Sequence, residues 1–126
     1  MEHPITERAV FVYGTLMQGQ RAHHMLSGAR YAGRFSLKDY AMYHLGRYPG
    51  IVACPGETVW GELYYVSPAM LEKMDEYEEE GSLYSRVTVR LQGENGSCTA
   101  QAYVYKKDVT GYPILRRPWG TQDNER

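Results

Sequence analysis

The stretch Thr58-Val59-Trp60-Gly61-Glu62-Leu63-Tyr64-Tyr65-Val66-Ser67-Pro68 decides the fold, because a long strand runs directly into a helix start. Residues 58–66 are rich in β-branched and aromatic side chains, which favour extended structure. Ser67 can cap a helix by accepting a hydrogen bond from an orphan amide, and proline is tolerated at the first helical position. We therefore predict a strand over 58–66 and a helix from Ser67 to about Glu79.

Five further segments have the pattern of strands, namely 9–12, 30–35, 40–45, 84–91 and 98–105. The last two are separated by Asn95-Gly96, a strong hairpin signal. A loop is expected through 48–56, which contains two Pro-Gly pairs, and a weaker, mostly polar helix over 18–26.

These elements predict an α+β fold with a mostly antiparallel sheet of six or seven strands and two helices, in which the sheet curls into a small β-barrel-like form. Residues 1–126 fit a single domain, with a core over about 9–106 and a polar C-terminal tail. Two helices are too few for a doubly wound nucleotide-binding fold, and GxGxxG is missing.

The composition restricts partners and location. Fourteen Lys and Arg oppose fifteen Asp and Glu, giving a net charge of -1, so no basic field is present to bind nucleic acid. No membrane helix or signal peptide is recognisable, and we expect a cytoplasmic protein without a membrane partner. Cys54 and Cys98 form no CxxC pair and predict neither a disulfide scaffold nor a thiolate metal site. Twelve tyrosines suit the walls of a partly polar cavity.

One carboxylate of the predicted helix is separated from the others by helix geometry. At about 100° per residue, Glu78 falls in the same arc as the apolar Leu71 and Met74. Desolvation would raise the pKa of an inward-facing glutamate, so that it can exchange protons near neutral pH. Alternatively, residues 78–80 are an acidic helix end in solvent, although acidic residues match the dipole at a helix C-terminus poorly.

Two further features are candidates for a binding site. Tyr13-Gly14-Thr15-Leu16 follows the first strand, and its glycine allows successive amides to converge on an anion or a carbonyl oxygen. The alternative is an ordinary turn. Tyr84 and Arg86 share a strand face, where Tyr84 either contacts a substrate or packs as a wall residue. Arg86 is predicted to brace Asp75 through an ion pair.

The sequence shows no pattern of residues typical of a metal site or of an acyl-enzyme mechanism. Adjacent His23 and His24 would point about 100° apart on a helix and cannot bind one metal as an i, i+4 pair does. His44 is predicted to be a cross-strand neighbour rather than a base, and no serine stands in a GxSxG elbow. We therefore predict a site without a metal.

Five motifs occur in order along the chain: Phe11-Val12-Tyr13-Gly14-Thr15-Leu16, Leu45-Gly46-Arg47-Tyr48-Pro49-Gly50, Val59-Trp60-Gly61-Glu62-Leu63-Tyr64, Met74-Asp75-Glu76-Tyr77-Glu78 and Tyr84-Ser85-Arg86. Together they resemble the gamma-glutamylcyclotransferase-like family, specifically its gamma-glutamylamine cyclotransferase branch. The resemblance implies that family's fold. It places glutamyl binding on Tyr13, Gly14, Thr15 and Leu16, and the general acid/base on Glu78.

The reaction that the resemblance implies is intramolecular. The α-amine of a γ-glutamyl group attacks its own γ-carbonyl, closes 5-oxoproline and expels the amine bound there. Five-membered closure needs orientation and proton handling, which Glu78 would provide, and no metal or organic cofactor is implied. The implied partner is a small γ-glutamyl amine, whose amine the sequence does not identify.

The chain departs from the family pattern directly after Glu78. A glycine usually follows, whereas here Glu79 and Glu80 intervene before Gly81. This departure supports an alternative function, a non-catalytic small-molecule binding protein on the same fold. The presence of Glu78 favours an active enzyme.

Overall fold

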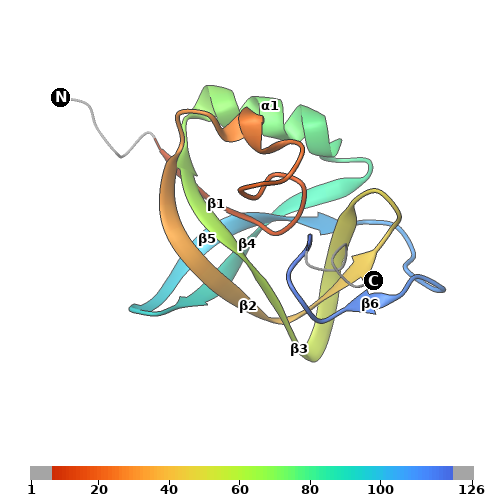
Figure 1. The fold of residues 1–126 in the computed structure, drawn as a ribbon. Coiled ribbons are helices and arrows are strands. Elements are labelled where there is room, and N and C mark those ends of the chain that lie inside the picture. The colour runs from red at the N-terminus through yellow and green to blue at the C-terminus, as the bar shows by residue number, and fades with distance from the viewer. Residues whose placement is uncertain (1–6, 121–126) are drawn as a thin grey trace.

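The predicted strand over 58–66 and the predicted helix that starts at Ser67 are both present in the structure. The computed structural model describes residues 7–120 (Figure 1). Its strands are β1 (Arg8–Val12), β2 (Arg30–His44), β3 (Pro49–Val66), β4 (Tyr84–Gly93), β5 (Gly96–Tyr105) and β6 (Ile114–Leu115). The helices are the 3-10 helix η2 (His23–Leu26) and the α-helix α1 (Pro68–Glu78). The predicted α+β class is confirmed, and six strands lie within the described range.

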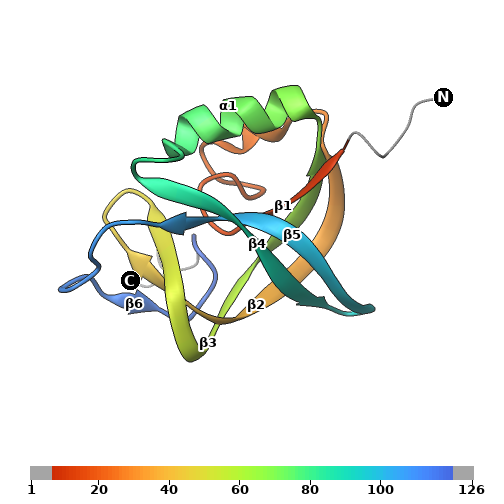
Figure 2. The ribbon, with the colours of Figure 1, turned by 180° about the vertical axis from the view of Figure 1, so that it is seen from behind.

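The sheet has the strand order β3-β1-β5-β4-β2-β6, and β2 also pairs with β3. All neighbours pair antiparallel except β1 and β5, which are parallel at Val10 and Gln101. The sheet is therefore mixed but mostly antiparallel, and its barrel-like form stays a prediction. Helix α1 lies along one end of the curved strands (Figure 2). Over residues 7–120, no helix has the length and apolar character needed to cross a membrane.

The predicted loop over 48–56 is wrong from residue 49 onward, because residues 49–56 are part of strand β3. The strand pairs with β2 on both sides of a register shift, at which Lys38 faces Thr58 and Tyr40 faces Ala53. Residues 54–57 therefore form an extra segment opposite Asp39, whose carboxylate accepts a hydrogen bond from the amide of Gly56 at 2.9 Å. A proline in such a bulge removes no ladder hydrogen bond, so the turn residues are accommodated inside one long hairpin. The predicted strands 30–35 and 40–45 likewise form one strand, β2.

The predicted helix over 18–26 is also wrong, since only the four residues of η2 are helical. Gly19 and Gly28 have φ values of 81° and 91°, in the left-handed region that interrupts a right-handed helix. The chain instead folds as successive turns, with hydrogen bonds from Gln20 N to Met17 O and from His23 N to Gln20 O. Amphipathic spacing alone predicted a helix where the glycines impose turns.

Strand β1 is buried on both faces and positions the site. Val10 and Val12 pack in one core cluster, which also contains Leu71 and Met74 of α1. The alternate residue Phe11 belongs to a second cluster with residues of the long β2–β3 hairpin. The loop that follows β1 therefore starts from a strand that core packing holds on both sides. Ser67 caps α1 as predicted, accepting a hydrogen bond from Met70 N at 3.1 Å.

Candidate active site

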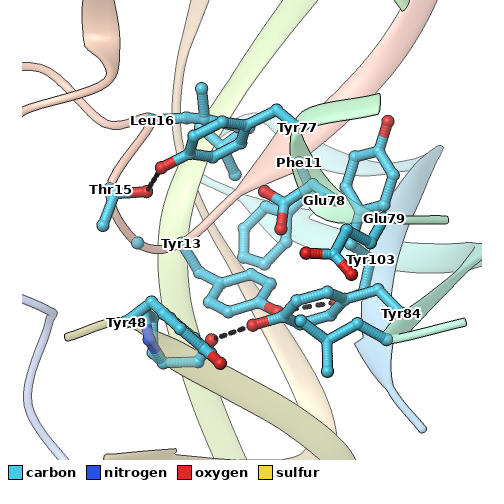
Figure 3. Close-up of a pocket in the computed structure, with 14 residues that line it drawn as sticks. Phe11, Tyr13, Thr15, Leu16, Tyr48, Tyr77, Glu78, Glu79, Tyr84 and Tyr103 are labelled. Atoms are coloured by element: carbon cyan, nitrogen blue, oxygen red, sulfur yellow. Dashed lines mark hydrogen bonds between the residues drawn. The ribbon is translucent and has the colours of Figure 1, made fainter. Parts of the chain in front are cut away.

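One pocket lies where the end of β1, the end of α1 and the start of β4 meet (Figure 3). Its volume is about 130 Å³. All six residues that the sequence analysis assigned to a site line this pocket, namely Tyr13, Gly14, Thr15, Leu16, Glu78 and Tyr84. The structure thus brings together three segments that are distant in sequence, while the chemical role of each residue stays a prediction.

The turn after β1 depends on close contact between Gly14 and Pro49. A Cβ atom at residue 14 would lie 2.5 Å from Cγ of Pro49, so only glycine fits there without a shift. The turn closes with a hydrogen bond from Met17 N to Gly14 O at 3.0 Å. Within residues 7–120, the amides of Thr15 and Leu16 make no hydrogen bond to another backbone group outside helices and strands. Both residues line the pocket, and we predict that their amides bind a ligand there.

Glu78 is the last residue of α1, and its side chain points into the pocket (Figure 3). Helix geometry predicted this direction. Burial raises the pKa of the Glu78 carboxyl from 4.5 to about 7. Among the described residues, no hydrogen bond to the Glu78 carboxylate compensates for the lost solvent. A carboxyl group with a pKa near neutrality can both take up and release a proton at physiological pH.

Two of the tyrosines that line the pocket donate hydrogen bonds from their hydroxyls to backbone carbonyls. Tyr84 donates to the carbonyl of Pro49 and Tyr13 donates to the carbonyl of Tyr103, each at 2.7 Å. Burial raises the pKa of both Tyr13 and Tyr84 well above the usual range, so neither hydroxyl ionises near neutral pH. Of the two roles open for Tyr84, this geometry favours a packed wall residue whose ring faces the pocket.

A hydrogen bond joins the two functional segments across the pocket. The hydroxyls of Thr15 and Tyr77 lie 2.8 Å apart (Figure 3). Thr15 is buried, and Tyr77 comes from α1 directly before Glu78. This bond therefore ties the end of α1, and with it Glu78, to the turn after β1.

Asp75 connects the C-terminal half of α1 to the sheet through a hydrogen bond and an ion pair. Tyr103 donates a hydrogen bond to Asp75 Oδ1 at 2.6 Å, and Arg86 Nε lies 3.2 Å from the same oxygen. The predicted ion pair between Arg86 and Asp75 is confirmed. Arg86 also donates to Gln101 Oε1 at 2.8 Å, which connects α1 to both β4 and β5. Asp75 therefore fixes the helix that carries Glu78.

Replacing Asp75 with asparagine should lower the free energy of unfolding by about 1–2 kcal/mol. The substitution removes the charge that strengthens the bond from Tyr103 and the pairing with Arg86, both partly shielded from water. Urea unfolding measures this change. Glu76→Gln is the matched control, since Glu76 is exposed on the same helix and should change stability by less than about 0.5 kcal/mol. Equal stability of the two variants would contradict this role.

The comparison with known proteins now identifies the family. A family model described as gamma-glutamyl cyclotransferase, AIG2-like, matches residues 10–121. The chain belongs to this family. The resemblance based on five short motifs is thereby confirmed, and the pocket described above is formed within the matched region.

Relatives of this family come from bacteria and animals. The gamma-glutamylcyclotransferase family protein YtfP of Escherichia coli K12 is 38% identical over 106 residues, covering 84% of this chain and 89% of YtfP. Gamma-glutamylaminecyclotransferase A of Danio rerio is 33% identical over 120 residues, covering 86% and 74%. The crystal structure of a mouse AIG2-like protein superposes with a TM-score of 0.76 at 27% identity, covering 87% and 86%.

Eight residues that line the pocket were not assigned to the site from the sequence, namely Phe11, Val12, Tyr48, Pro49, Tyr77, Glu79, Leu83 and Tyr103. The abundance of tyrosine indicated a partly polar cavity but not which tyrosines form it. Tyr48 reaches the pocket from the bend between β2 and β3, and Tyr103 reaches it from β5, which pairs with β4 and β1; no local pattern predicts these positions. Tyr77 is 40% exposed, and its hydroxyl bonds to that of Thr15.

The histidines of residues 7–120 lie outside this pocket. His23 Nδ1 is 2.9 Å from the carbonyl of Leu16, and His44 pairs with Pro49 across β2 and β3, as a cross-strand neighbour. Residues 7–120 contain no group of three or more His, Cys, Asp or Glu arranged to hold a metal ion. Cys54 and Cys98 are both free thiols.

Proposed function

We propose that the protein is a gamma-glutamylamine cyclotransferase that converts a γ-glutamyl amine into 5-oxoproline and a free amine. The observation that carries this proposal is the Glu78 carboxyl, with a pKa of about 7, in the same pocket as Thr15 and Leu16 of the turn after β1. Membership of the gamma-glutamyl cyclotransferase family and the animal relative named for this activity support it. The chemistry requires neither a metal nor an organic cofactor.

Proton transfer through Glu78 is the central step of the proposed reaction. The Glu78 carboxylate takes a proton from the α-ammonium, and the freed nitrogen forms a bond to the γ-carbonyl carbon. The bond between that carbon and the leaving nitrogen then breaks. In total two protons pass from the α-nitrogen to the leaving nitrogen, which departs as an ammonium. A pKa near neutrality allows Glu78 to carry them in turn.

The loop after β1 provides for the charge that develops on the carbonyl oxygen. When the ring closes, this oxygen carries negative charge in the tetrahedral intermediate. Amide donors held in place by the contact of Gly14 with Pro49 would stabilise it by about 3–4 kcal/mol per donor. Holding the two ends of the glutamyl group within bonding distance supplies the remaining advantage, because the reaction is intramolecular.

A direct test is to incubate the purified protein with a panel of γ-glutamyl amines and to follow 5-oxoproline by mass spectrometry. We expect 5-oxoproline and the free amine in equal amounts. Recovery of the bound compound intact, with no 5-oxoproline from any member of the panel, would contradict the proposal. That result would instead support a non-catalytic binding protein.

The rate should depend on pH through Glu78. Since the ionised carboxylate is the base and its pKa is about 7, kcat/KM should fall about tenfold per pH unit as the pH drops below 7. Initial rates between pH 5 and pH 8 measure this profile. A rate that is constant over this range would rule out Glu78 as the base.

A further inference from the structure

Glu79 has a backbone conformation that glycine would adopt more easily. It is the C-cap of α1, in the left-handed region with φ 53° and ψ 54°. Its N–H donates to the carbonyls of Asp75 and Glu76, and its own carbonyl accepts from the amides of Ser82 and Leu83. A residue with a Cβ atom is less stable than glycine in this region. The position therefore carries a side chain at an energetic disadvantage, beside the pocket.

The Glu79 side chain lines the same pocket as Glu78. Figure 3 shows both carboxylates directed into the space between Tyr77 and Tyr84. Glu79 is the exposed one of the two, so it lies on the solvent side of the pocket. No Lys, Arg or His is among the described residues that line this pocket. Its ionisable lining therefore consists of two carboxylates and of tyrosines, and beside Glu79 its field attracts cations and repels anions.

The two carboxylates face different parts of a substrate in the proposed reaction. The glutamyl group must reach Glu78, where the proton is transferred. The leaving amine must then extend from the reacting carbon toward solvent, past the exposed Glu79. A positive charge on this outer part would meet the Glu79 carboxylate, whereas a carboxylate on it would be repelled.

We propose that Glu79 is a specificity-determining residue that selects a leaving amine with a second positive charge and no carboxylate, such as one end of an aliphatic diamine. This inference rests on the proposed cyclotransferase reaction and narrows its substrate class. Glu79 does not touch the reacting atoms. Its contribution is therefore expected in KM, because it binds a remote charge equally well before and during the reaction.

Three substrates of nearly equal size test this inference. They are γ-glutamyl conjugates of 1,4-diaminobutane, butylamine and 4-aminobutyrate, whose outer ends are cationic, neutral and anionic. We expect kcat/KM for the cationic compound to exceed that for the neutral one by about three- to fivefold, and that for the anionic one by about tenfold. In Glu79→Gln the preference for the cationic over the neutral compound should disappear. Glu76→Gln removes an exposed charge from the same helix outside the pocket, and should retain this preference.

Binding measurements separate this inference from the proposed reaction. Calorimetric titration of the three compounds into Glu78→Gln, and into Glu78→Gln with Glu79→Gln, needs no turnover. Cation-selective binding that is lost with Glu79, without 5-oxoproline from the unmodified protein, would support the charge selectivity of Glu79 and overturn the proposed reaction. The inference would be overturned if turnover or binding were the same for the cationic, neutral and anionic compounds. It would also be overturned if the preference for the cationic compound persisted in Glu79→Gln. Failure to bind any of the three compounds would overturn both.

Discussion

Replacing Glu78 with glutamine is expected to lower kcat by about 10²- to 10⁴-fold, the usual contribution of a general acid or base. Glutamine has the same shape as glutamate but cannot take the proton from the α-ammonium or return one to the leaving nitrogen. The amides of Thr15 and Leu16 remain in place, so the substrate should still bind. Rates of 5-oxoproline formation measure kcat, and calorimetry measures binding.

Two further variants serve as controls for the Glu78→Gln measurement. Glu76→Gln makes the same chemical change on the exposed side of α1 and should retain full activity. Glu78→Asp keeps the carboxyl group but withdraws it by one methylene, so its activity should lie between those of the unmodified protein and Glu78→Gln. A Glu78→Gln variant with more than a tenth of the normal kcat would exclude Glu78 as the acid/base.

Local signals predicted those parts of the molecule that neighbouring residues determine. Ser67 and Pro68 mark the start of α1, and the capping bond to Met70 N occurs as expected. The period of the helix directed Glu78 inward, because Leu71 and Met74 fix the buried face. These predictions succeeded because a helix relates side chains over three or four residues, a distance that the sequence displays directly.

Contacts between distant segments were less accessible to sequence reasoning. Pro55 and Gly56 were predicted to lie in a loop. They lie instead in a bulge of β3, which exists only because β3 pairs with β2 on both sides of it. The parallel pairing of Val10 with Gln101 joins strands from opposite ends of the chain. The need for glycine at residue 14 is set by Pro49, which no spacing rule connects to it. Register and close approach are properties of the assembled sheet.

The same burial that suits Glu78 for proton transfer should destabilise the folded protein at high pH. In the unfolded chain a glutamate ionises near pH 4.5, whereas in the folded protein the pKa of Glu78 is about 7. Between these values the unfolded state has released the proton and the folded state still holds it. The contribution of Glu78 to the free energy of unfolding must therefore fall as the pH rises through this interval, and it levels off above pH 7.

Glu78→Gln should consequently be more stable than the unmodified protein at pH 8, by roughly 3 kcal/mol from a pKa shift of this size. At pH 4 both side chains are mostly neutral in the folded and unfolded states, so the difference should nearly vanish. Urea unfolding at pH 4, 6 and 8 measures both proteins, and because the substitution changes one group, the other titrating residues cancel in the difference. A stability difference that does not vary with pH would mean that Glu78 ionises normally in the pocket. Glu78 of the unmodified protein would then have neither the raised pKa that suits it for proton transfer at neutral pH nor the loss of stability that burial of its charge causes.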